Sequence, residues 1–210
     1  MALEPDPFFP HPDGPWHETH FDETVEGIRS LLMRYAAGQV SEHHLLKGKD
    51  NGRVKRDTLS YWLYFQHHLG HERWKILGQR YWSVQAYASF RDRFCATPEA
   101  KRHSSDGGAS LATIPKRRAD GDQGLLSEHV VPKKVMKRLL LDPPGSIADL
   151  LRLNICAVVT LSEDRRLVRA GHIDPFNPWV RYAGTGIRFI ENPSWTNAER
   201  ADLARYDLIA

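Results

Sequence analysis

The fold is decided by Ser127-Glu128-His129-Val130-Val131-Pro132-Lys133-Lys134 and, further along the chain, by Asn154-Ile155-Cys156-Ala157-Val158-Val159-Thr160-Leu161-Ser162-Glu163-Asp164. The first stretch predicts a short strand from Leu125 to Val131. Pro132 favours an end to this strand, because proline cannot donate to a continuing ladder. The second stretch predicts a strand from Ile155 to Thr160, followed by a helix from Ser162 to Ala170. An acidic residue and a histidine therefore end one strand, and acidic residues open the helix after the other.

The residues between the two strands, and those after them, predict shorter elements. Lys134 to Leu141 is typical of a basic amphipathic turn or short helix, and the prolines of 142–145 stop it. Residues 147–153 predict another helix. From His172 onward, frequent proline and glycine favour loops and short strands.

The N-terminal part of the chain has helical spacing of its apolar residues. Residues 1–21 contain five prolines before Trp16 and predict an extended arm. Helices are expected from Asp22 towards Gly38, over 58–69 and over 80–95. The sequence thus predicts a helical lobe over 22–98, a basic flexible linker over 99–124 and a second lobe over 125–210.

The composition of the chain limits the classes of protein to which it can belong. The 210 residues are 41% hydrophobic and 26% charged, which is typical of a folded globular chain. No apolar run approaches the roughly 20 residues of a membrane-spanning helix, so no membrane partner is expected and a cytoplasmic location is favoured. The two cysteines, Cys95 and Cys156, are too few for a disulfide framework or a four-cysteine zinc site.

Basic residues gather around the pair Glu128-His129, although the formal net charge is only +3. Such a field is typical of proteins that contact a phosphate backbone. The expected nucleic-acid-binding residues are Lys116, Arg117, Arg118, Lys133, Lys134, Lys137 and Arg138.

The pair Glu128-His129 is the candidate catalytic pair of this sequence. Hydrolysis of a phosphodiester at neutral pH needs a base that activates water and a cation that neutralises developing charge. A histidine suits the first task because its ordinary pKa lies near 6.5, close to working pH. The neighbouring carboxylate can face a metal ion if the strand bends or ends at this point.

The spacing of these residues resembles that of the His-Me finger, or HNH, nucleases, over about residues 125–170. The resemblance implies two antiparallel strands and a helix around one divalent ion. It assigns His129 as general base and Glu128 as metal ligand. It also places Asn154 among the catalytic residues, where it supports the loop before the second strand. Asp164 falls where the last metal ligand would stand, and Glu163 could serve instead.

Two positions depart from the family pattern, since Glu128 replaces the more usual Asp and Asp164 the usual His or Asn. Both are oxygen ligands, which suit one Mg²⁺ or Mn²⁺ ion better than zinc. The paired cysteines with which many HNH proteins bind a structural zinc are missing.

The expected fold class is therefore α+β, with a helical N-terminal lobe, a ββα-metal catalytic unit and an irregular C-terminal tail. The expected function is that of a metal-dependent, HNH-like endonuclease acting on DNA, double-stranded DNA being favoured, in a setting such as restriction or defence. A homodimer would suit double-strand cutting. Two alternatives stay open: a non-catalytic nucleic-acid-binding protein that uses the basic surface around 101–138, and a protein-interaction module built on the helical lobe.

Overall fold

A computed structural model describes residues 20–47, 55–66, 76, 79–96, 121–171, 174–191 and 208, without the side chains of 93–96. The described residues form two compact units. The helical unit takes its residues from Glu18–His68 and His129–Ile155, and the sheet unit takes its described residues from Leu69–Glu128 and Cys156–Ala210. The chain is an α+β protein.

Five helices form the helical unit, as far as its described residues go: α1 (Phe21–Ala36), α2 (Glu42–Leu46), α3 (Leu59–Phe65), α7 (Lys133–Leu141) and α8 (Ile147–Arg152). α1 packs against α3 and α8, and α7 packs against α3 and α8. Their apolar faces bury one core, made of Val25, Ile28, Leu31, Leu45, Leu59, Leu63, Val131, Met136, Leu140, Leu150 and Leu151. This core combines residues from both sides of the expected linker, because α7 and α8 complete it.

Local sequence explains where these helices begin and end. The side chains of Ser41, Thr58 and Ser146 cap α2, α3 and α8, each accepting a hydrogen bond from a backbone N–H three residues further on. Such caps satisfy donors that the first turn of a helix leaves without partners. Gly38 has a φ of +71°, so the chain turns there after α1 in a conformation that glycine adopts easily. The helices expected near Asp22, Thr58 and Ile147 are confirmed.

The described residues of the sheet unit form four strands, β1 (Tyr81–Ser83), β2 (Leu125–His129), β3 (Cys156–Thr160) and β4 (Phe189–Glu191), in the order β2-β3-β1-β4. β1 runs parallel to β3, with Trp82 opposite Val158, and antiparallel to β4, with Trp82 opposite Ile190. The same part of the chain also contains α5 (Val84–Ala96), the 3₁₀ turn η2 (Gly121–Gln123), α9 (Leu161–Ala170) and α10 (Val180–Ala183).

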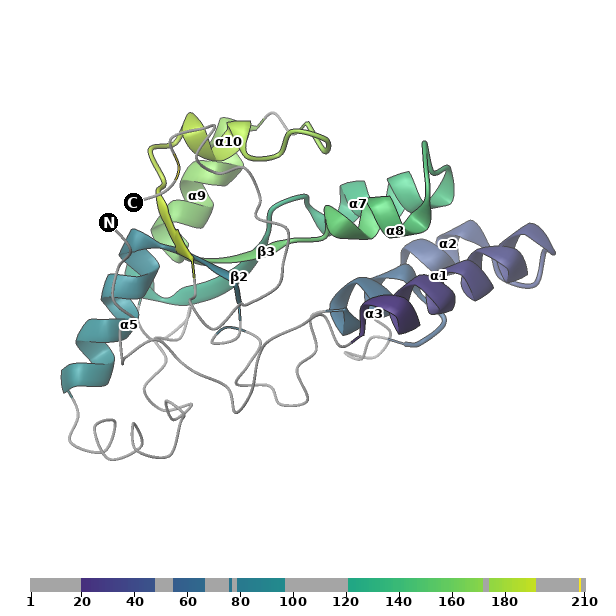
Figure 1. Ribbon diagram of the computed structural model, residues 1–210, viewed down its shortest axis with the longest axis horizontal. Helices are drawn as coiled ribbons and strands as arrows, with labels where there is room; N and C mark the ends of the chain where they lie inside the picture. The colour runs from purple at the N-terminus through teal and green to yellow at the C-terminus, as the bar shows by residue number, and fades with distance from the viewer. Residues whose placement is uncertain are drawn as a thin grey trace. The chain divides into compact units, whose positions relative to one another are not determined.

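β2 and β3 run antiparallel to each other. Leu161 N–H donates to the Gly124 oxygen at one end of the pair, and Val130 N–H donates to the Ile155 oxygen at the other, each at 2.9 Å. Residue numbers therefore rise along one strand as they fall along the other, and α9 follows β3 directly. Figure 1 shows α9 above these strands, and both α9 and α5 pack against β3.

The helix expected over 80–95 is partly wrong. Tyr81, Trp82 and Ser83 form β1 and are fully buried, and the helix begins only at Val84. Bulky aromatic residues favour a half-buried pleated surface. Here, pairing with β3 and β4, both distant in the sequence, outweighs the helical spacing of Tyr81, Val84 and Tyr87.

Candidate active site

β2 ends at His129, two residues before the end at Val131 that the sequence predicts. Val130 and Val131 are buried, and Pro132 is the N-cap of α7, where its missing N–H costs no hydrogen bond. His129 is thus the last residue of a strand and lies just before a helix, a position that fixes its backbone while leaving its side chain partly exposed.

His129 contacts Asn154 within the helical unit. The Nδ1 atom of His129 lies 3.3 Å from Oδ1 of Asn154. The amide of Asn154 is only 1% exposed, and its Nδ2 donates to the Leu63 oxygen and to Oε1 of Gln66, each at 2.9 Å. Gln66, 3% exposed, donates through Nε2 to the Leu151 oxygen at 3.0 Å. The expected pair His129 and Asn154 therefore meets, and a buried amide chain holds Asn154.

Glu128 belongs to the sheet unit and pairs with Arg181 of α10. Nη2 of Arg181 lies 2.9 Å from Oε1 of Glu128, and the two side chains are 6% and 20% exposed. Burial lowers the pKa of Arg181, but the neighbouring Tyr182 and Glu128 outweigh it and leave the pKa raised. Burial, together with the charge of Glu128, raises the pKa of Tyr182. Arg181 is therefore a permanent cation beside Glu128.

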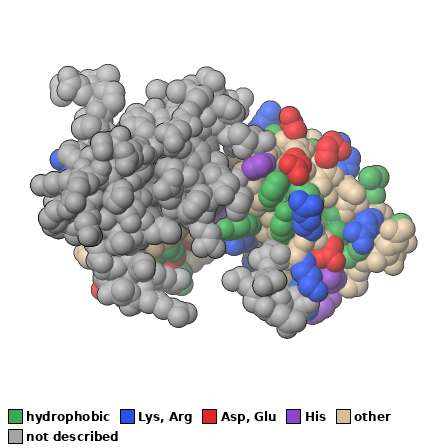
Figure 2. Space-filling model, turned by 90° about the horizontal axis from the view of Figure 1, so that it is seen from below, with side chains coloured by type: hydrophobic (Ala, Val, Ile, Leu, Met, Phe, Trp, Pro, Cys, Tyr) green, Lys and Arg blue, Asp and Glu red, His purple; other side chains and the backbone are tan. Residues whose placement is uncertain are grey.

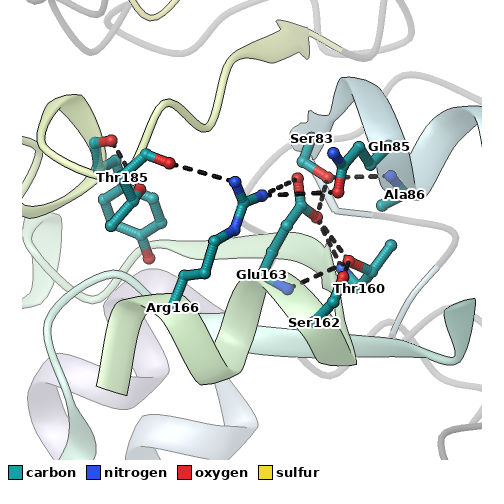
Figure 3. A network of polar contacts seen from close by, with 9 residues as sticks. Ser83, Gln85, Ala86, Thr160, Ser162, Glu163, Arg166 and Thr185 are labelled. Carbon is teal, nitrogen blue, oxygen red and sulfur yellow. Dashed lines mark hydrogen bonds and ion pairs between the residues drawn. The ribbon is translucent and has the colours of Figure 1, made fainter. Parts of the chain in front are cut away.

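Glu163 lies at the start of α9 and is 1% exposed. Its Oε2 accepts hydrogen bonds from the Thr160 N–H at 2.8 Å, from Oγ1 of Thr160 at 3.0 Å and from Oγ of Ser83 at 2.5 Å. Oε1 faces Nη2 of Arg166 at 3.7 Å. Figure 3 shows this carboxylate enclosed by these groups. Glu163 thereby caps α9 and links it to β1, as part of a capping box with Thr160.

Asp164 stands next to Glu163 in the first turn of α9 and is partly exposed. The carboxylates expected as metal ligands therefore differ in their surroundings. Within the described ranges, no three histidine, cysteine or carboxylate side chains gather as a group able to hold a metal ion. Proteins commonly hold Mg²⁺ through only one or two carboxylates, with waters and substrate phosphates completing the shell. Glu128 is paired with Arg181, and Oε2 of Glu163 accepts three hydrogen bonds in the network of Figure 3.

The expected nucleic-acid-binding residues divide into two groups. Lys116, Arg117 and Arg118 lie outside the described residues. The other four lie on α7, where Lys133, Lys134 and Arg138 are exposed.

Two of these α7 residues contact α2. Lys137 donates to the Leu46 oxygen at 2.5 Å, and burial, followed by the charge of Lys133, lowers the pKa of Lys137. Arg138 pairs with Glu42 at 2.8 Å. In Figure 2, acidic and basic side chains mix on the coloured surface at the right. Lys133, Lys134 and Arg138 are thus the exposed basic residues of α7, whereas Lys137 is partly buried.

Sequence reasoning missed Arg181 and Gln66. Arg181 lies in the segment from His172 onward, which is rich in proline and glycine and for which the sequence predicts mostly loops. Gln66 occupies the end of an apolar stretch, one residue after α3. A polar residue on the apolar face of a predicted helix was the available signal for Gln66, since buried polar groups need partners.

No family model, curated protein or solved structure matches the chain. No helix among the described residues is both long enough and apolar enough to cross a membrane.

Proposed function

We propose that the chain is a metal-dependent endonuclease that hydrolyses phosphodiester bonds in DNA, with double-stranded DNA as the favoured substrate. The observation that carries the proposal is the contact between His129 Nδ1 and Asn154 Oδ1 at 3.3 Å. Because Nδ1 of His129 contacts a buried amide, Nε2 of the same ring can face a water molecule. Orientation of the base by a neighbouring group is the usual arrangement around such a histidine.

The order of the elements also supports the proposal. β2 carries the pair Glu128-His129 at its end, β3 runs antiparallel to β2, and α9 follows β3 with Asp164 in its first turn. These elements follow the chain order that the resemblance to His-Me finger nucleases implies. The long connection between the two strands holds α7 and α8.

Under this proposal, His129 accepts a proton from the attacking water, and Lys133 and Lys134 bind phosphates of the DNA backbone. Glu128 and Asp164 would hold one Mg²⁺ or Mn²⁺ ion, with the Arg181 guanidinium fixing the carboxylate of Glu128. Such an ion neutralises charge on the phosphate and on the leaving oxygen. Asn154 keeps the imidazole of His129 in place during the proton transfer.

A plasmid cleavage assay tests the proposal. The full chain is incubated with supercoiled plasmid and Mg²⁺ or Mn²⁺, and the rate of nicking is compared with that of His129→Ala. A positioned general base contributes about 10²–10⁴-fold, so His129→Ala should lose activity by about that factor. His43→Ala is the matched control, because His43 is exposed on α2. Equal rates for the wild type and His129→Ala would refute the assignment.

A second candidate is a non-catalytic DNA-binding protein, which the exposed lysines of α7 favour. Binding that weakens steeply with salt, with no cleavage under any metal condition, would support this candidate. Absence of DNA binding at low salt would instead favour a protein-interaction module.

A further inference from the structure

The orientation of the Gln66 amide is fixed by its partners. The Leu151 carbonyl oxygen can only accept, so the atom that meets it at 3.0 Å is the Nε2 donor of Gln66. The other end of the amide, Oε1, is then an acceptor and receives a hydrogen bond from Nδ2 of Asn154.

The same reasoning fixes Asn154. Its Nδ2 meets two acceptors, the Leu63 carbonyl oxygen and Oε1 of Gln66, each at 2.9 Å. Turning this amide over would place oxygen against oxygen at both contacts. Because Asn154 and Gln66 are 1% and 3% exposed, water is poorly placed to compensate for that repulsion. Oδ1 of Asn154 therefore faces His129.

An amide oxygen accepts hydrogen bonds and never donates them. The contact between Nδ1 of His129 and Oδ1 of Asn154 is consequently a hydrogen bond only if Nδ1 carries the proton. The neutral imidazole then has its lone pair on Nε2. A histidine side chain free in water prefers the opposite tautomer, so the surrounding amides reverse an intrinsic preference.

We infer that Gln66 is a positioning residue, which acts through Asn154 to hold His129 in the Nδ1–H tautomer and so makes Nε2 the proton-accepting atom. The role of that atom as a base rests on the proposed function, whereas the tautomer itself does not. The chain from the Leu151 oxygen through Gln66 and Asn154 to His129 joins the end of α3 to the residues after α8.

Nuclear magnetic resonance tests the tautomer directly. A long-range ¹H–¹⁵N spectrum of the full chain, recorded about two units above the ordinary histidine pKa of about 6.5, separates protonated from bare ring nitrogens. His129 is one of 11 histidines, and its signals are those that vanish in His129→Ala. The expected spectrum has a protonated Nδ1 and a bare Nε2. A dominant Nε2–H form in the wild type would overturn the inference without need of any other variant.

Three substitutions then separate the role of Gln66 from general packing. Gln66→Leu removes the acceptor for Asn154 and should lower the Nδ1–H population. Because Asn154 keeps the Leu63 oxygen, plasmid cleavage should fall by only about tenfold, less than the 10²–10⁴-fold of a lost base. Gln66→Glu, as the protonated acid, keeps an acceptor for Asn154 and a donor for the Leu151 oxygen and should retain the wild-type tautomer. Gln39→Leu alters an exposed glutamine after α1 and should change neither measurement.

The outcomes distinguish the inference from the proposed function. An unchanged tautomer in folded Gln66→Leu would overturn the role of Gln66. If Gln66→Leu fails to fold, Asn154→Leu and Gln66→Glu provide the comparison, and an unchanged tautomer in Asn154→Leu would overturn the inference. A tautomer that shifts as expected in a chain that never cleaves DNA would support the positioning role and refute the nuclease proposal.

Discussion

At the scale of single residues, the neighbours Glu163 and Asp164 have different surroundings. Oε2 of Glu163 accepts three hydrogen bonds, from two atoms of Thr160 and one of Ser83, and the side chain is 1% exposed. Asp164 is partly exposed in the same helical turn. Their sequence positions alone favour neither as a metal ligand, because helices commonly begin with acidic residues.

We predict that Glu163→Ala lowers the free energy of unfolding by about 2–4 kcal/mol, because it leaves Ser83 and the start of α9 without their buried acceptor. Urea unfolding at neutral pH measures this loss. Asp164→Ala is the matched control and should cost only about 0.3–1 kcal/mol, the value of an acidic group near a helix N-terminus. Equal losses for the two variants would show that the network of Figure 3 contributes no special stability.

At the scale of the elements, β1 links β3 to β4 although it has only three residues. Trp82, at its centre, is fully buried. Its ring is tilted against that of Phe90 with centroids 5.5 Å apart, and its Nε1 donates to the Gln79 oxygen at 3.0 Å. The strand is therefore both a sheet partner and part of the core.

We predict that Trp82→Ala lowers the free energy of unfolding by about 3–5 kcal/mol, as expected for a large aromatic residue lost from a core. Val84→Ala, two residues on, should change stability by less than about 0.5 kcal/mol, because Val84 is 42% exposed. Chemical unfolding followed by circular dichroism compares the two. A loss below about 1 kcal/mol for Trp82→Ala would contradict a central position for β1.

Elements with local signals were predictable from the sequence. Thr160 caps α9 through its side chain, and Pro132 follows a strand that ends at His129. β1 was not predictable in this way, since its partners β3 and β4 lie far along the chain. The same holds for the candidate site. His129 and Asn154 belong to the sequence motif and could be predicted, whereas Gln66 lies 88 residues from Asn154 in the sequence and could not.

At the scale of the whole molecule, the core of the helical unit is assembled from two distant segments. α1, α2 and α3 precede the sheet residues of 79–96, and α7 and α8 follow β2. The later segment supplies Val131, Met136, Leu140, Leu150 and Leu151 to that core. α2 and α3 have only 5 and 7 residues, and isolated helices shorter than about 12–15 residues are marginal in water.

We therefore predict that a fragment ending at residue 124 has no cooperative thermal transition, although it contains the whole helical lobe expected from the sequence. A chimaera that joins 18–68 to 129–155 through a flexible Gly/Ser linker keeps both halves of the core and should unfold cooperatively. Circular dichroism on heating compares the two with the full chain. A cooperative transition in the fragment ending at residue 124 would mean that α1, α2 and α3 are stable without α7 and α8, and that their shared core contributes little to the folding of the N-terminal helices.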